Sequence, residues 1–285
     1  MSLIYTHMYF YFRDQYRWHD RVSRETGYTF DIQAGDICEV RAIWYVLCLG
    51  EKISRSEQYP KKPSRAEEWE WIHTFPWVIS DQALTLLHRF VNERYTTYKK
   101  AIPLRIPDPD RLLSLSTAQS LSKTTRTQNI KKPKKIEPPQ HFFRNIDIYT
   151  DIQKYDASSD RYKQTLILFP DVWTMAQSLD ITQAKTNKHI LVLHNMTTPA
   201  KAKAYWKIKQ WEVQYIFATT AQMFWDWYAL WHIIVIKGDR NYYKTMQDPR
   251  YHAVTVAAEL THVYDAFLDT HLLSDWKLKN SDESD

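Results

Sequence analysis

Two pairs of acidic and histidine side chains have a spacing that binds metal in some helical proteins. Glu70-x-x-His73 and Glu259-x-x-His262 repeat the Glu-x-x-His pattern of di-iron carboxylate bundles, in which both ligands project from one helix face. The chain has 11 histidines, so about one such pair is expected by chance. No predicted helix supplies the further bridging glutamates. We therefore expect these four residues to be ordinary core or surface side chains.

Three later histidines form a second candidate group. His252, His262 and His271 lie close in sequence, and the last two fall on one predicted helix covering residues 254–273. Nine residues of helix are two and a half turns, which places those two side chains on opposite faces. This arrangement is poor for metal binding. We expect no metal and no other cofactor.

Acidic residues beside lysine raise the possibility of a nuclease. A restriction-type nuclease holds Mg²⁺ with acidic residues on adjacent strands and places a lysine beside them. Asp151-Ile-Gln-Lys154 has one residue more than the usual spacing, and the strand that follows Asp171 contains no acid-x-Lys pair. The catalytic pattern is incomplete, so we expect no catalytic residues. A restriction-endonuclease-like nuclease stays the third functional alternative, with Asp151 and Asp171 as its test positions.

The rare residue types exclude several other enzyme classes. The chain has only four glycines and contains neither a Walker loop nor a dinucleotide-binding fingerprint. It also lacks the Gly-x-Ser-x-Gly elbow of hydrolases. Cys38 and Cys48 are the only cysteines, which excludes a disulfide framework and a thiolate metal site and favours a reducing compartment. We expect no enzymatic activity of its own and no small-molecule substrate.

Charge is the next indication of function. The 285 residues carry a net charge of +5, which permits contact with nucleic acid without requiring it. Within a polar stretch at residues 116–140, Lys131, Lys132, Lys134 and Lys135 form KKPKK, which is typical of a nuclear localisation signal or a phosphate-binding patch. The alternative is a solvated loop. We expect an intracellular protein, nuclear if KKPKK is a signal and otherwise of the virion or cytoplasm. No secretory or membrane-spanning segment is expected.

Composition divides the chain into four parts. Residues 1–78 form an aromatic-rich extension or small domain, with strands predicted at 8–12 and 42–49. Residues 79–115 contain a helix starting at Ser80, with apolar residues at helical spacing, followed by a proline-rich segment. Residues 116–140 are a basic flexible linker or insertion, and residues 141–285 form an α/β domain that ends in a helix.

The last part alternates predicted strands and helices. The strands are at residues 164–169, 189–193, 213–217 and 233–237, and the helices are at 171–179, 199–210, 219–231 and 254–273. In the third helix, Phe224, Trp227, Tyr228 and Trp231 would share a core-facing side. Alternation of this kind predicts an α/β fold with a mostly parallel or mixed sheet and flanking helices.

One joint between a strand and a helix carries polar residues. In ILVLHNMTTPAK, residues 190–193 predict a strand buried on both faces, and His194 with Asn195 ends it. Thr198 is a predicted N-cap, and Pro199 suits the first helical turn because its missing N–H costs nothing there.

The order of elements around this joint resembles the N-terminal jaw domain of the fifth subunit of eukaryotic-type multisubunit RNA polymerases. The likeness covers about residues 80–237. Its matching segments are residues 166–169 and 190–193, Asn195, Thr198-Pro199-Ala200-Lys201, VQYIFATTAQMF, IIVIK and, upstream, ALTLLHRFVNERY. The family's Thr-Pro-Ser-Ala loop reads Thr-Pro-Ala-Lys here, the stretch after the fourth strand reads GDRNYY, and the family's C-terminal assembly domain has no counterpart.

The resemblance implies a fold, a function and partners. It implies a restriction-endonuclease-like α/β topology without catalysis, lying near downstream DNA, with the large polymerase subunits and DNA as partners. Thr198, Pro199 and Lys201 would then be the DNA-proximal residues. The leading hypothesis is a non-catalytic accessory subunit of a transcription complex, viral in origin if its divergence has that cause. The alternative is a structural or scaffolding subunit of a virion or other large assembly.

Overall fold

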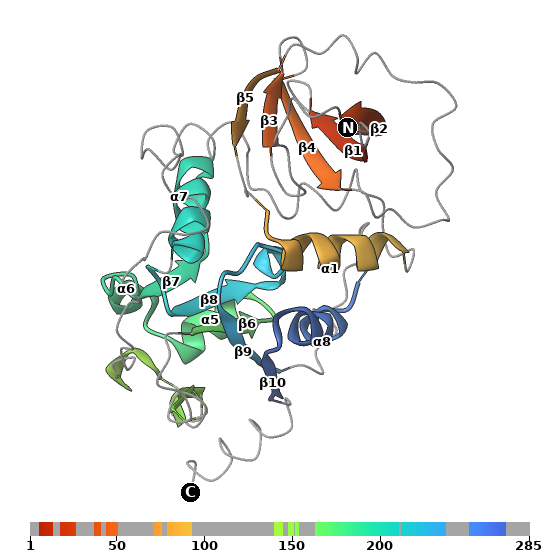
Figure 1. Cartoon of the computed structure of the whole chain (residues 1–285). Helices are drawn as coiled ribbons and strands as arrows, with labels where there is room; N and C mark the ends of the chain where they lie inside the picture. Colours follow the sequence, from red (N-terminus) through yellow and green to blue (C-terminus); the bar gives the residue numbers. More distant parts are fainter. Residues whose placement is uncertain are drawn as a thin grey trace, which may run out of the picture. The chain divides into compact units, whose positions relative to one another are not determined.

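The chain forms two compact units, residues 1–128 and residues 129–285, which Figure 1 draws in one view. The computed structural model describes residues 6–13, 18–26, 37–40, 44–50, 71–75, 79–92, 140–144, 148–150, 152–153, 163–210, 212–237 and 251–271.

The first unit contains a five-stranded antiparallel sheet. Its strands lie in the order β2-β1-β4-β3-β5. They are β1 (Thr6–Arg13), β2 (Trp18–Thr26), β3 (Ile37–Val40), β4 (Trp44–Gly50) and β5 (Trp71–Phe75). The strands predicted at residues 8–12 and 42–49 correspond to β1 and β4.

Helix α1 (Asp81–Asn92) follows the sheet in the chain and starts where its sequence predicts. The Ser80 hydroxyl accepts a hydrogen bond from the backbone N–H of Ala83 (3.2 Å), which satisfies one of the free donors at the helix start. Asp81 in the first turn is favourable for the helix dipole. The apolar positions of the predicted core face are buried, and they are Ala83, Leu84, Leu87, Phe90 and Val91.

The second unit contains a five-stranded sheet that is parallel throughout its described strands, which confirms the predicted α/β class and selects parallel over mixed. The order is β10-β9-β6-β8-β7. The strands are β6 (Gln164–Phe169), β7 (Ile190–Leu193), β8 (Tyr215–Thr219), β9 (Leu230–Val235) and β10 (Phe267–Thr270). The first strand of this unit, β6, is the central one, and its residues are buried because both neighbours and both faces cover it.

Helices connect these strands across both faces of the sheet. They are α5 (Val172–Ser178), the short α6 (Ile181–Ala184), α7 (Thr198–Lys209) and α8 (Ala253–Tyr264), with 3₁₀ turns η3 (Gln140–Phe142) and η4 (Thr220–Gln222). The chain moves from β6 to β7 in one direction and from β7 through β10 in the other. Right-handed crossovers therefore place α5 opposite α7, as Figure 1 shows.

The structure corrects two predicted helices. Residues 219–231 form the 3₁₀ turn η4, then turns, and then the start of β9, so the predicted helix is wrong. Phe224 and Trp227 are buried as expected, but Tyr228 is exposed and they do not share a helix face. The predicted helix at residues 254–273 ends at Tyr264 because Asp265 has φ of 53° and leaves the helical region. Residues 267–270 continue as β10, paired with β9.

One face of the sheet packs against segments far apart in the sequence. Phe143 forms an isolated antiparallel bridge with Leu179, and its ring lies 5.8 Å from the ring of Phe217. Ile148 and Ile152 are also buried in this cluster, together with Ile167 of β6. The short pieces at residues 140–153 are therefore part of the same core as the parallel sheet.

Candidate nucleic-acid interface

Parallel strands bring the carboxyl ends of β6, β7, β8 and β9 to one edge of the sheet. In open parallel α/β sheets, ligands bind outside these carboxyl ends, where the connections leave in opposite directions. Here the connection after β6 leads toward β7 and the connection after β9 leads toward β10. The switch point of this sheet therefore lies between β6 and β9, and the β7–α7 joint lies on the same carboxyl edge, two strands from β6.

The β7–α7 joint is a tight turn followed by an open helix start. Asn195 has φ of 47°, a left-handed conformation that asparagine tolerates better than most residues. The N-cap is Thr197 and not Thr198, so the prediction was wrong by one residue, and Pro199 is the second helical residue. The Thr197 side chain makes no capping hydrogen bond, although its carbonyl accepts the N–H of Lys201 at 2.9 Å.

Three predicted DNA-proximal residues come together at this helix start. Thr198 and Pro199 are exposed, and Lys201 is half-buried one turn further on. The first turn of α7 contains no acidic residue. Free N–H groups and the positive end of the helix dipole favour an anion here. The arrangement has the chemistry to hold a phosphate.

The neighbouring helix starts are closed by the protein's own carboxylates. Asp171 accepts hydrogen bonds from the backbone N–H (2.7 Å) and the hydroxyl (3.1 Å) of Thr174 at the start of α5. Asp180 caps α6 by accepting from the backbone N–H groups of Thr182 and Gln183. Both carboxylate oxygens of Asp171 accept hydrogen bonds, so capping of α5 accounts for an acidic residue at this position.

The nuclease alternative gains no support from the described positions. Asp171 is a helix cap, while Asp151 and Lys154 lie outside the described residues. Within the described part of the chain, no group of three or more His, Cys, Asp or Glu side chains is placed to hold a metal ion.

The Glu-x-x-His pairs do not form a metal centre in the described structure. His73 belongs to the strand β5, so the helical spacing does not apply to it, and Glu70 lies outside the described residues. Glu259 and His262 both lie on α8. His271 comes after β10 and not on that helix, which corrects the premise that two of the later histidines share one helix.

Lys237 lies at the carboxyl edge and was not among the site residues predicted from the sequence. It follows β9, it is only 6% exposed, and its φ of 53° is unusual for a residue with a β-carbon. The sequence contains one signal for Lys237, because this lysine ends the apolar run IIVIK and a glycine follows it. Lys237 occupies the strand end beside β6, where a nucleotide-binding α/β fold would present a turn open to ligand.

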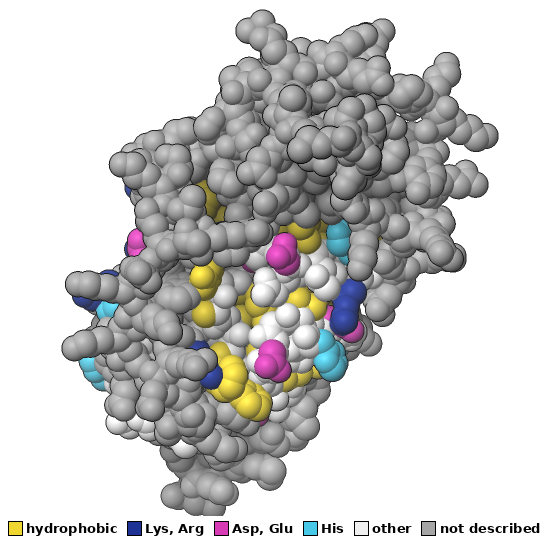
Figure 2. Space-filling view, in the orientation of Figure 1, with side chains coloured by type: hydrophobic (Ala, Val, Ile, Leu, Met, Phe, Trp, Pro, Cys, Tyr) yellow, Lys and Arg dark blue, Asp and Glu magenta, His cyan; other side chains and the backbone are white. Residues whose placement is uncertain are grey.

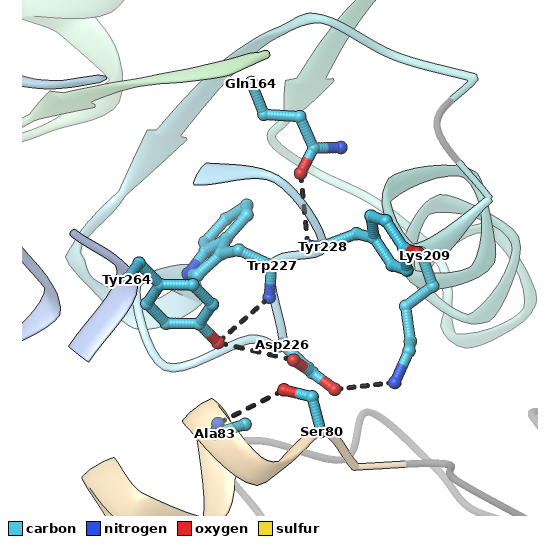
Figure 3. Close-up of polar contacts among 8 residues, drawn as sticks. All are labelled: Ser80, Ala83, Gln164, Lys209, Asp226, Trp227, Tyr228 and Tyr264. Atoms are coloured by element: carbon cyan, nitrogen blue, oxygen red, sulfur yellow. Dashed lines mark hydrogen bonds and ion pairs between the residues drawn. The ribbon is translucent and has the colours of Figure 1, made fainter. Parts of the chain in front are cut away.

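A buried ion pair lies at the opposite, amino-terminal edge of the sheet. Lys209 at the end of α7 donates a hydrogen bond to Asp226 (2.6 Å), and the two side chains are 6% and 1% exposed. The Tyr264 hydroxyl at the end of α8 donates to the other oxygen of Asp226 (3.3 Å) and accepts from the N–H of Trp227 (3.3 Å; Figure 3). The cluster ties α7, α8 and the loop before β9 together, so its role is structural.

Gln164 completes this structural network at the first residue of β6. Its side-chain amide donates to the carbonyl groups of Ile208 (2.9 Å) and Val213 (3.2 Å). Its side-chain carbonyl accepts from the N–H of Tyr228 (3.2 Å; Figure 3) and from the N–H of Ala229 (3.2 Å). A single buried amide thus holds the chain before β8 and the chain before β9.

The aromatic residues divide into core and surface. Trp206, Trp225 and Trp227 are buried, which confirms packing over base stacking for these three. Trp231 packs edge-on against Phe267 with ring centroids 4.7 Å apart. Trp211 lies outside the described residues. Trp173, in the first turn of α5, is 67% exposed at the carboxyl edge, and sequence analysis did not single it out.

The basic KKPKK segment, with Lys131, Lys132, Lys134 and Lys135, also lies outside the described residues. The structure therefore brings together one predicted group of nucleic-acid-binding residues, Thr198, Pro199 and Lys201, and does not address the other. No known family model matches the sequence, and no curated protein is significantly similar to it. Among the helices that the structure describes, none is both long enough and apolar enough to cross a bilayer.

Proposed function

We propose that this chain is a non-catalytic accessory subunit of a transcription complex that contacts the phosphate backbone of DNA through the β7–α7 joint. One observation carries the proposal: an exposed helix start without a side-chain cap stands at the carboxyl edge of a parallel sheet, with Lys201 in its first turn and a basic helix behind it. Backbone N–H groups and lysines bind phosphate without reading sequence.

The non-catalytic part of the proposal follows from what occupies the carboxyl edge. The joint after β6 is Pro170-Asp171, with the carboxylate of Asp171 engaged at the α5 cap. The joints after β7 and β8 contain no glycine that would let a backbone wrap a nucleotide phosphate. The joint after β9 begins with the buried Lys237. These features support binding from outside the edge and give no support to hydrolysis within it.

The identity of the complex rests on the resemblance to the polymerase jaw domain alone. So do the large polymerase subunits as partners and the restriction-endonuclease-like topology. The proposal of phosphate contact needs only the parallel sheet and its carboxyl edge. The scaffolding alternative is not favoured by a particular observation, because the exposed large apolar side chains in the described part, Trp173, Tyr228 and Phe267, come from separate elements.

A charge placed at the helix start tests phosphate contact without weakening the helix. Thr198→Glu puts a carboxylate at the first residue of α7, where it stabilises the helix dipole but repels a phosphate. Thr255→Glu is the matched control, because Thr255 is exposed in the first turn of α8, whose start also lacks a side-chain cap. Fluorescence anisotropy with a labelled duplex measures the affinity of both full-length variants.

We expect Thr198→Glu to weaken DNA binding about tenfold, equivalent to about 1.4 kcal/mol, and Thr255→Glu to leave it unchanged. Equal affinity of the Thr198→Glu variant and the wild type would contradict the proposal. Affinity capture of the tagged chain from its native source tests the complex separately. Recovery of large polymerase subunits supports the transcription assignment, and recovery of structural proteins alone overturns it.

A further inference from the structure

Helix α7 presents a row of lysines to solvent along its whole length. Lys203 and Lys207 are exposed one turn apart, in line with the exposed Pro199, while the opposite side of the helix is buried. Two further exposed lysines, Lys185 and Lys188, precede β7. We call Lys185, Lys188, Lys203 and Lys207 the α7 lysine surface. Lys201 is half-buried at the helix start and points to the other side of α7, because two residues of helix are a rotation of about 200°.

The strand order brings the two groups of lysines to the same side of the unit. Strand β7 is the edge strand of the sheet, and α7 runs back from its carboxyl end toward its amino end. Lys188 comes just before that amino end, so the later lysines of α7 approach it. In Figure 1, α6, β7 and α7 lie together, away from α8 and β10.

Negative charge is absent from this segment. Residues 185–209 contain six lysines and no aspartate or glutamate. Lys209 is paired with Asp226, whereas Lys201 and the four lysines of the α7 lysine surface form no ion pair with any residue in the described ranges. Ordinary solvated surfaces intersperse both signs of charge, so a single-sign row of this length is a specific feature.

The described residues at the other edge of the sheet include acidic side chains and no lysine or arginine. Residues 251–271, which form α8 and β10, contain Glu259, Asp265 and Asp269 and no lysine or arginine. On the face that Figure 2 shows, basic and acidic side chains both occur, and most of the surrounding surface belongs to residues that are not described. A polyanion is therefore attracted to the β7 side and repelled from the β10 side.

We propose that the phosphate backbone of a nucleic acid runs along the α7 lysine surface, from the β7–α7 joint toward Lys188, and does not cross to the α8–β10 side. This inference rests on the proposed function and adds the path of the ligand to it. The 12 residues of α7 extend about 18 Å, and Lys203 and Lys207 are about 6 Å apart along the axis. This spacing suits consecutive backbone phosphates.

A pair of lysine variants with a charge-matched control tests the path. Lys203→Gln/Lys207→Gln removes two positive charges from α7, and glutamine is a good helix former. Thr255→Glu/Thr270→Glu changes the net charge by the same amount at two exposed sites on α8 and β10. The affinity of each full-length protein for a labelled DNA is measured over a range of salt concentrations.

We expect the double-lysine variant to bind about tenfold more weakly at low salt and the slope of log affinity against log salt to fall by about 2, one for each lost phosphate contact. The control keeps the wild-type slope. If the wild type binds DNA and the two variants have the same slope, the path is wrong while the proposed function stands. If the wild type does not bind DNA, both fail.

Discussion

Asp226 and Lys209 bury a complete ion pair in the second unit. Removing a charged side chain from water costs several kcal/mol. For a buried ion pair this cost is offset only when the two charges are close and their other donors and acceptors are hydrogen-bonded. The 2.6 Å contact and the Tyr264 hydroxyl meet both conditions. The sequence held a signal for the acid, since Asp226 stands inside the apolar run MFWDWY, but not for its partner 17 residues earlier.

Removal of one member of this pair is expected to destabilise the unit strongly. Asp226→Asn removes the carboxylate that lies 2.6 Å from the buried Lys209 ammonium, and breaking a buried pair in this way costs about 3–5 kcal/mol. Asp226→Asn combined with Lys209→Met removes both charges and recovers much of the loss. Urea unfolding of the three proteins measures this. A loss under 1 kcal/mol for the single variant would show that the pair is not buried in solution.

His189 offers a residue-scale test of the local electrostatics on the lysine side. Burial and, to a lesser extent, the positive charge of Lys188 lower its pKa below 6.5. A lowered pKa disfavours protonation of the folded state, so this stability contribution is complete above pH 6.5 and is lost as pH falls below it. Lys188→Gln should raise the pKa of His189 while burial keeps it under 6.5. An NMR titration that finds the pKa unchanged would exclude the contribution of Lys188.

At the scale of elements, substitutions of the helix cap Asp171 distinguish a structural role of this acid from a catalytic one. Asp171→Ala removes the hydrogen bonds to Thr174 and should cost about 1 kcal/mol, whereas Asp171→Asn keeps a capping oxygen and costs much less. Thermal unfolding separates the two variants. A nuclease would respond differently, because Asp171→Asn would abolish Mg²⁺-dependent cleavage whatever its effect on stability.

Elements with one clear periodicity could be predicted from the sequence, and elements without one could not. The run QTLILF is β6 as predicted, and α1 begins after Ser80 as predicted. The helix predicted at residues 219–231 was wrong because this segment has so many aromatic side chains that some fall at helical spacing without forming a helix. The prediction missed strand β10 because the helical pattern of apolar residues continues past Asp265. The left-handed φ of Asp265 could not be predicted from the sequence, because a residue with a β-carbon rarely adopts it.

The candidate site was predictable only in part for a similar reason. Thr198, Pro199 and Lys201 follow an apolar run and carry turn and helix-start chemistry, so local sequence identifies them. The exposed row of Lys203 and Lys207 becomes visible only when the buried side of α7 is known. Lys188 joins them only because β7 is the edge strand, which depends on long-range strand order.

At the scale of the whole second unit, charge is divided across a single parallel sheet. Among the described residues, the β7 side has lysines that form no ion pair with any described residue, and α8 and β10 have acids and no lysine or arginine. Such a division orients an approaching polyanion before contact and speeds association at low salt. It adds little to folding, because exposed charges of this kind contribute only small stabilities. We therefore relate the division to the proposed contact with DNA.

Lysine footprinting of the full chain is the most direct test of whether DNA contacts the start of α7 and the α7 lysine surface. Brief acetylation with and without a saturating duplex, read by mass spectrometry, reports the accessibility of each lysine. We expect DNA to reduce acetylation of Lys201, Lys203 and Lys207 several-fold. Acetylation of Lys163, whose ammonium lies over the Trp231 ring of β9, should not change. Unchanged acetylation of the α7 lysines in a protein that has bound DNA would contradict the account.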